Sequence, residues 1–227
     1  MPSLSDAIPA RVKQLRAWTP ERQQTWRETH PQEQLIFHVL LDASGSMTRY
    51  AEPLRRGYNL YLAWLQRARQ PMAMLDLRLF GTQLGAAQMQ ALGLASPLTP
   101  ETYAATLGST ELWQALRTVC TTTTPHGQHI LIVFTDGQDN HVQDKDPASL
   151  HTLLTTLQAE AGWLCVYLGT DANALEAATA LGFHPGNTLT FPNERIPEAF
   201  ETLRAATQRY LITPAVARKL LAQQGIF

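Results

Sequence analysis

The sequence predicts an α/β fold, in which a doubly wound, mostly parallel sheet of about six strands carries helices on both faces. Strand-sized apolar runs alternate with amphipathic helical stretches along most of the 227 residues, as is typical of parallel strands joined by crossover helices. The runs Leu35–Leu41 and Ile130–Phe134 are almost unbroken in apolar residues, which indicates strands buried on both faces. A chain of this length can bury a sizeable core without disulfides or zinc.

The first half of the predicted sheet begins with the strand Leu35–Leu41. A helix is expected over about 53–69, because apolar residues recur there at helical spacing. A second buried strand follows over about 72–80, and the short segment 83–94 favours an antiparallel edge strand. Thr99-Pro100-Glu101 combines a capping residue, a first-turn proline and an acid, so we expect a short helix to begin there.

The second half continues the alternation of helices and strands. Asp146-Pro147 marks one helix start, and apolar periodicity places the other boundaries. The expected elements are a helix at 111–121, a strand at 130–135, a helix from 147 to 160, a strand at 163–168, a helix at 173–181, a strand at 188–191 and a helix at 197–211.

Two segments stand outside this alternation. Residues 1–33 have few apolar positions and are interpreted as an N-terminal helical arm, followed by the α/β domain over 34–211. The arm holds five basic residues, four acids and two tryptophans, which would suit contact with nucleic acid, although we favour docking of the arm on its own domain. Residues 212–227 predict a C-terminal helix, for which packing on this domain and packing in a partner's groove both stay open.

The composition argues against several classes of function. The formal net charge is −1 and 16% of residues are charged, so no strong positive field favours a dedicated nucleic-acid coat. The apolar runs are far shorter than the roughly 20 residues of a membrane-spanning helix. The first residues lack the pattern of a secretory signal, and we therefore expect a cytoplasmic location. Cys120 and Cys165 lie in apolar patterns without zinc or redox spacing and are expected to be buried.

Three short polar segments fall where predicted strands end or helices begin. Asp42-Ala43-Ser44-Gly45-Ser46 follows the first strand, Gly108-Ser109-Thr110 precedes a helix, and Thr135-Asp136-Gly137 ends the strand that starts near residue 130. Ligands of open α/β sheets bind beyond the carboxyl ends of the strands. The three segments are therefore expected to converge on one site.

The side chains of these segments favour a hard divalent cation. They supply five oxygen-bearing groups and neither sulfur nor imidazole, namely Asp42, Ser44, Ser46, Thr110 and Asp136. This set suits Mg²⁺ best, with Mn²⁺ or Ca²⁺ as alternatives. Because three of the five are neutral hydroxyls, the cation would stay weakly neutralised and would attract one more carboxylate. The alternative interpretation is that the serines and the threonine cap helices and that Asp136 makes an Asx turn.

With these motifs, residues 34–211 resemble the von Willebrand factor A (VWA) domain family. The resemblance implies the Rossmann-like VWA fold and a metal-ion-dependent adhesion site. Ser44, Ser46 and Thr110 would then meet the metal directly, and Asp42 and Asp136 directly or through water. The segment Leu98–Leu116 also looks like stand-alone bacterial and phage-related members of the family, although Gln114 stands where those relatives often have Asp.

Other polar residues are assigned structural roles. Asp139, Asp144 and Asp146 could hold a second cation, but a solvated loop with Asp146 as a helix cap is favoured. Gly169-Thr170-Asp171 also follows a strand and could line the same site, although a helix cap is favoured there too. His38 is expected to be a hydrogen-bonded core residue, whereas His126 and His129 are expected to be exposed beside a turn.

Two classes of function fit the predicted metal site. In the favoured hypothesis the protein is a binding module, whose cation captures an Asp or Glu of a partner protein. The alternatives are a metal-dependent hydrolase and a nucleic-acid-associated VWA protein that uses the basic arm. No general base or nucleophile is placed at the metal by a motif, so we expect a protein that is not an enzyme. The sequence does not predict the oligomeric state.

Overall fold

The structure is a computed structural model. It describes residues 34–227 except 69–72, 124–126, 137–145 and 160. The predicted N-terminal arm over 1–33 therefore lies outside the described residues. None of the described helices is long and apolar enough to cross a membrane.

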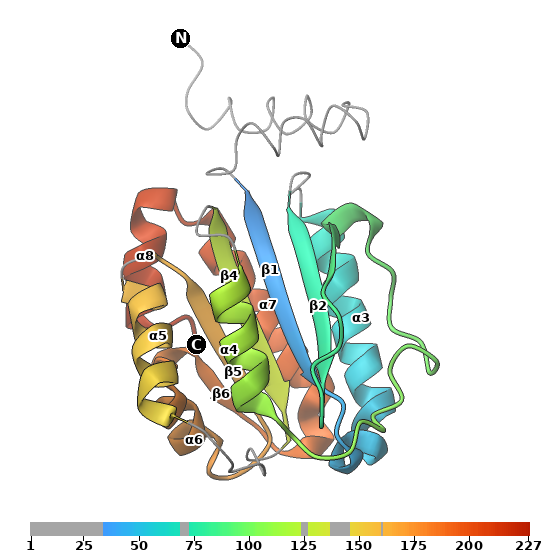
Figure 1. The fold of residues 1–227 in the computed structure, drawn as a ribbon. Coiled ribbons are helices and arrows are strands. Elements are labelled where there is room, and N and C mark those ends of the chain that lie inside the picture. The colour runs from blue at the N-terminus through green and yellow to red at the C-terminus, as the bar shows by residue number, and fades with distance from the viewer. Residues whose placement is uncertain (1–33, 69–72, 124–126, 137–145, 160) are drawn as a thin grey trace.

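The described residues form the α/β fold that the sequence predicts, with a single six-stranded sheet (Figure 1). The strands lie in the order β3-β2-β1-β4-β5-β6, so the chain winds outward from β1 in one direction and from β4 in the other. Every pairing is parallel except that of β2 with β3. The strands are β1 (Leu35–Asp42), β2 (Met74–Phe80), β3 (Gln88–Ala91), β4 (Gln128–Thr135), β5 (Leu164–Gly169) and β6 (Thr188–Thr190).

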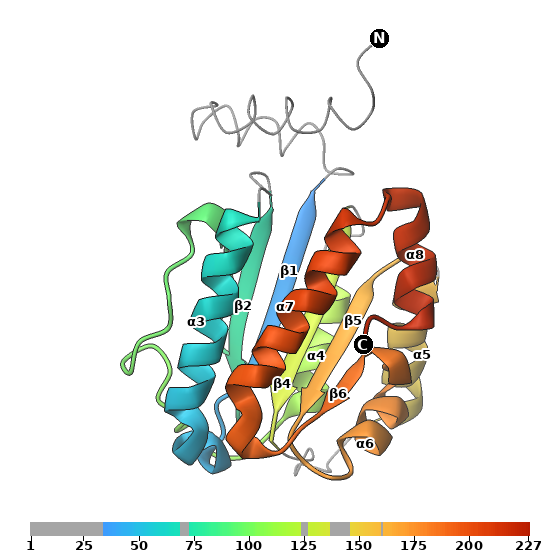
Figure 2. The same cartoon turned by 180° about the vertical axis from the view of Figure 1, so that it is seen from behind.

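Helices cover both faces of the sheet (Figures 1 and 2). Two of them, α3 and α7, lie together on one face, while α4, α5 and α6 lie on the other. The helices are η2 (Gly45–Tyr50), α3 (Ala51–Arg67), η3 (Leu92–Leu94), α4 (Leu112–Thr122), α5 (Pro147–Ala159), α6 (Ala174–Leu181), η4 (Pro185–Asn187), η5 (Asn193–Arg195), α7 (Ile196–Ile212) and α8 (Ala215–Gln224), where η denotes a 3₁₀ helix.

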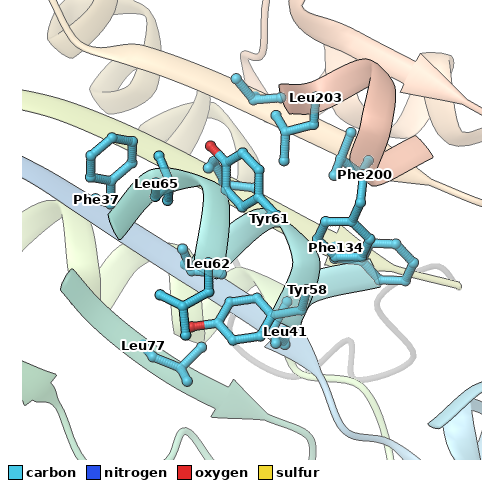
Figure 3. Close-up of a cluster of buried hydrophobic side chains, with 14 of the residues drawn as sticks. Phe37, Leu41, Tyr58, Tyr61, Leu62, Leu65, Leu77, Phe134, Phe200 and Leu203 are labelled. Atoms are coloured by element: carbon cyan, nitrogen blue, oxygen red, sulfur yellow. The ribbon is translucent and has the colours of Figure 1, made fainter. Parts of the chain in front are cut away.

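The central strand β1 is buried along its whole length. Its side chains alternate between the faces, so that Phe37 and Leu41 pack with α3 and α7 while Leu40 packs on the α4 side. Figure 3 shows the first of these clusters, where tyrosines and leucines of α3 meet Phe200 of α7. The two helices approach closely at Gly57, since a Cβ atom there would lie 2.5 Å from the Phe200 ring.

The C-terminal helix α8 packs on its own domain, against α5, α7 and β5. Asn187 ties this end of the chain down, because its side-chain amide donates to the Ala222 carbonyl at 2.7 Å and its oxygen accepts from the Ile226 amide at 3.0 Å. Ala222 and Ile226 are buried. The interpretation of α8 as a self-packing helix is thus the one that the structure favours.

The prediction of a short helix that begins at Thr99 is wrong, because the chain makes only a hydrogen-bonded turn there. The hydroxyls of Thr99 and Thr102 bond to nearby backbone groups, which competes with helix formation. Ala105 then has a φ of +53°, a left-handed conformation that a helix does not accept. The segment instead leads Tyr103 into the core.

The expectation that His129 is exposed is also wrong. β4 begins at Gln128, two residues earlier than the apolar run suggests, because the Gln128 amide pairs with the Gln34 carbonyl. His129 therefore lies inside the sheet, with its Nδ1 atom 3.1 Å from Nε2 of His38. His38 is the buried, hydrogen-bonded residue that the sequence predicts. Both cysteines are buried, as predicted.

Leu40→Ala is expected to lower the free energy of unfolding by about 2–5 kcal/mol, because it removes buried apolar surface and leaves a cavity. Leu40 is fully buried in the central strand. Urea unfolding followed by circular dichroism measures the effect. Leu60→Ala is the control, since the Leu60 side chain is 61% exposed and its loss should change stability by less than about 0.5 kcal/mol. Equal effects of the two substitutions would contradict this core.

Candidate metal centre

The three predicted segments meet at the carboxyl end of the sheet, where β1 and β4 end side by side (Figure 1). Asp42 is the last residue of β1, and Asp136 follows directly after β4. The loop after β1 is fixed by backbone hydrogen bonds from the Ala43 amide to the Phe80 carbonyl at 2.7 Å and from the Gly45 amide to the Gly108 carbonyl at 2.8 Å. The segment containing Gly108 is thereby held against the segment containing the two serines.

Four of the five predicted site residues form one continuous chain of polar contacts. The Oγ atoms of Ser44 and Ser46 lie 3.0 Å apart, and the Ser46 hydroxyl donates to Oδ1 of Asp136 at 2.9 Å. Asp42 is connected to Ser44 through the backbone, because its Oδ1 accepts a hydrogen bond from the Ser44 amide at 2.8 Å. Its other oxygen accepts from the Thr135 hydroxyl at 2.6 Å. The sequence motifs therefore bring both carboxylates and both serines to one place.

Thr110, the fifth predicted residue, lies in the loop that Gly108 anchors. Its side chain is buried, and within the described part of the chain no hydrogen bond joins it to the other four residues. The loop is fixed on its other side by the segment that follows β2, through bonds from the Ser109 amide to the Thr82 hydroxyl and from the Glu111 amide to the Gly81 carbonyl, both at 3.0 Å. Gly108 needs to be glycine, since its φ is +75° and a Cβ atom would lie 2.3 Å from Oγ1 of Thr82.

Two supporting residues were missed as functional positions by the sequence analysis. Thr135 holds Asp42, and the buried Tyr103 hydroxyl donates a short hydrogen bond to the Asp42 carbonyl. Thr135 stands next to Asp136 at a strand end, which is a signal that could have found it. Tyr103 comes from a loop 61 residues away in the sequence, so no local pattern indicates its contact.

The surroundings of Asp42 and Asp136 disfavour the ionised form of each carboxyl group. Burial raises the pKa of Asp42, hydrogen bonds from Ser44 and Thr135 offset part of this effect, and the charge of Asp136 adds to it. Burial also raises the pKa of Asp136, where Ser46 and Arg49 act in the opposite direction and Asp171 raises it further. Neither carboxylate has a salt bridge to a described basic side chain. A cation at this place would remove the repulsion.

The donor set fits a six-coordinate hard cation. Neighbouring ligands of Mg²⁺, each about 2.1 Å from the ion, lie roughly 3.0 Å apart. The distances of 3.0 Å between the two serine hydroxyls and 2.9 Å from Ser46 to Asp136 match this spacing. Among the described residues there is no group of three or more His, Cys, Asp and Glu side chains that could hold a metal. A zinc-type cluster is therefore not the pattern found here.

The helix-capping interpretation of the motifs is not supported by the contacts. Neither Ser44 nor Glu111, the residues that precede η2 and α4, makes a side-chain cap hydrogen bond, and the Ser46 hydroxyl contacts Asp136 instead of its own helix. Asp146 does cap α5, as predicted, by accepting from the Ser149 amide at 3.1 Å. The other acids of the possible second cation site, Asp139 and Asp144, lie outside the described residues.

The β5–α6 loop borders the same site. Asp171 is close enough to affect the pKa of Asp136, and its own Oδ1 accepts from the Asn173 amide at 2.6 Å. This bond lies before α6, whose preceding residue is Asn173, so the helix cap that the sequence favours here is not formed. The Thr170 amide donates to the Thr135 carbonyl at 3.3 Å, which holds this loop beside β4. The Thr170 hydroxyl is buried without a hydrogen-bond partner in the described part of the chain.

Asp136→Asn is expected to stabilise the metal-free protein at neutral pH, because it removes a buried charge and keeps the oxygen that accepts from Ser46. A raised pKa means that the folded protein binds the proton more tightly than the unfolded chain, so the contribution of Asp136 to stability falls as the pH rises through that pKa. The gain from the substitution should therefore shrink on acidification and vanish below the ordinary pKa of 3.8. Urea unfolding in EDTA across this pH range measures it; a gain that is independent of pH would contradict the assigned repulsion.

No protein-family model matches the sequence, and no curated protein sequence matches it closely. Solved structures match in fold. Proximal thread matrix protein 1 from the mussel byssus is 15% identical, with a TM-score of 0.55, over 77% of this chain and 46% of its own. A further structure of that protein, described as having a zinc-occupied MIDAS motif, matches with the same TM-score of 0.55 at 15% identity over 79% of this chain and 47% of its own.

Bacterial and archaeal proteins match similarly. The pilus adhesin SpaC from Lactobacillus rhamnosus GG is 12% identical, with a TM-score of 0.60, over 78% of this chain and 30% of its own. The ArnB paralog VWA2 from Sulfolobus acidocaldarius is 17% identical, with a TM-score of 0.52, over 75% and 45%. This chain thus covers less than half the length of these three solved proteins. At these identities the likeness concerns the fold, and the chain has a VWA-like fold.

Proposed function

We propose that this chain is a protein-binding module that depends on a divalent cation. The observation that carries the proposal is the row of oxygens from Ser44 through Ser46 to Asp136, spaced as neighbouring ligands of one ion would be, with Asp42 held beside them by the Ser44 backbone amide. Asp42 is buried and Asp136 is half-buried, and neither has an ion pair with a basic side chain among the described residues, so a cation would satisfy charges that the fold leaves unbalanced.

In this proposal each residue has a defined part. The hydroxyls of Ser44, Ser46 and Thr110 would contact the cation directly, and Asp42 and Asp136 would do so directly or through water. Mg²⁺ is the cation we propose first, because the set contains only oxygen donors. The cation would supply an open coordination position, and an Asp or Glu of a partner protein would fill it.

The comparisons support the general class of this proposal. One protein similar in fold, a thread matrix protein, has a structure described with a zinc-occupied MIDAS motif, and another is a pilus adhesin. We propose no catalytic role, since in the described part of the chain Asp42 and Asp136 contact hydroxyls and backbone amides but no imidazole or lysine. The cytoplasmic location remains a prediction from the sequence.

Ser46→Ala should weaken the binding of Mn²⁺ at least tenfold, because it removes a hydroxyl that contacts both Ser44 and Asp136. Isothermal titration of the metal into the full chain measures the affinity. The matched control is Ser96→Ala, an exposed serine in the loop after η3. Equal metal affinity in Ser46→Ala, Ser96→Ala and wild type would contradict the proposed ligand set.

We expect a partner protein that co-purifies with this chain in Mg²⁺ and dissociates in EDTA. Binding of that partner and binding of the metal to this chain should be coupled. Because coupling between two ligands is reciprocal, the partner should raise the metal affinity by the factor by which metal raises the partner affinity. The Asp136→Ala variant should stay folded but lose both metal binding and partner binding. A partner held equally well by wild type and by Asp136→Ala in EDTA would show that the metal is incidental.

A further inference from the structure

Arg49 lies on the same face of η2 as Ser46. A 3₁₀ helix has about three residues per turn, so side chains at positions i and i+3 stand one above the other. Both residues belong to η2 (Gly45–Tyr50), and both are exposed. Because the Ser46 hydroxyl contacts Asp136, Arg49 lies one turn of η2 beyond a residue of the candidate metal site.

The Arg49 guanidinium has no anionic partner among the described residues. Its contact is with the ring of Tyr50, whose centroid lies 4.7 Å from the guanidinium carbon. Its positive charge nevertheless reaches Asp136 and acts to lower the pKa of that carboxyl. Within the part of the chain that the structure describes, Arg49 is therefore a cation near an acidic site that no ion pair neutralises.

Asp171 borders the site on the opposite side. In the sheet order, β4 lies between β1 and β5, and Asp136 follows β4. Arg49 comes from the segment after β1 and Asp171 from the segment after β5, so these two charges flank Asp136 from opposite directions. Among the described residues, the candidate metal site therefore has a positive charge on the η2 side and a negative charge on the α6 side.

This asymmetry constrains how a partner carboxylate would bind. A cation with one open position would contact only one oxygen of a partner carboxylate, which leaves the second oxygen without a partner. A nearby guanidinium would add positive charge and donate hydrogen bonds in a geometry that suits a carboxylate. The negative Asp171 disfavours placing the second carboxylate oxygen on its side.

We propose that Arg49 is the second anchor for the acidic residue of the partner. One oxygen of that carboxylate would occupy the open position of the cation, and the other would accept a hydrogen bond from Arg49, turned away from Asp171. This inference rests on the proposed function. It adds a specificity determinant, because a neutral amide at the same place would gain nothing from the guanidinium charge.

The test uses the full chain saturated with Mg²⁺ and a small probe, N-acetyl-aspartate N-methylamide, titrated while amide resonances are followed by NMR. Arg49→Ala should weaken probe binding about tenfold at low salt without weakening Mg²⁺ binding, since the loss of a nearby positive charge does not disfavour a cation. Arg49→Lys should be intermediate, since it keeps the charge and loses the planar donor pair. Asp171→Asn should strengthen binding about two- to threefold.

The matched control is Arg56→Ala, which removes the same charge from an exposed position of α3 and should leave probe binding unchanged. The asparagine analogue of the probe should bind wild type and Arg49→Ala equally weakly, and the difference between these proteins for the aspartate probe should shrink at high salt. Equal binding of the aspartate probe by wild type and Arg49→Ala, together with its loss in Ser46→Ala, would overturn the role of Arg49 and leave the proposed function standing. The proposed function itself would be contradicted if the wild-type protein did not bind the aspartate probe in Mg²⁺, or if it bound the probe equally well in EDTA.

Discussion

The structure depends at its functional end on the placement of two carboxylates, Asp42 and Asp136, at the ends of adjacent parallel strands. The register of β1 with β4 brings them together, and burial of the sheet end keeps water from screening them. Two like charges at such a place are stable only if something compensates them. The surrounding hydroxyls of Ser44, Ser46 and Thr135 donate hydrogen bonds or provide oxygens, but they add no positive charge.

The rest of the fold holds this arrangement in place from a distance. The buried faces of β1, packed under α3 and α7 on one side and α4 on the other, fix the strand end from which Asp42 projects. Tyr103 and Gly108 then attach the loop before α4 to the loop after β1. Stability therefore comes mainly from the core, whereas the carboxylates oppose it, so substitutions at the two places are expected to separate folding from binding.

The sequence predicted the fold and the convergence of the motifs because both follow from local patterns. An unbroken apolar run such as Leu35–Leu41 specifies a doubly buried strand, and parallel strands bring their carboxyl ends to one edge. The sequence-based predictions were wrong where contacts between residues far apart in the sequence determine the local structure. His129 is buried because β4 extends to pair with Gln34. The segment at Thr99 forms a turn instead of the expected helix, and it places Tyr103 in contact with Asp42. The position of Arg49 depends on η2 being a 3₁₀ helix, which no sequence pattern had indicated.

A second buried acid shows what distinguishes a structural carboxylate from one that seeks a ligand. Burial acts to raise the pKa of Asp76, as it does for Asp42, but hydrogen bonds and charge from His38 and Arg78 outweigh it and the pKa is lowered. Arg78 lies 3.0 Å from the Asp76 carboxylate, and His38 in turn contacts His129. This cluster is complete within the chain. Asp42 and Asp136 have no such basic partner among the described residues, and the charge of Arg49 acts on Asp136 without forming an ion pair with it, which is why we propose a cation and a further anion at this site.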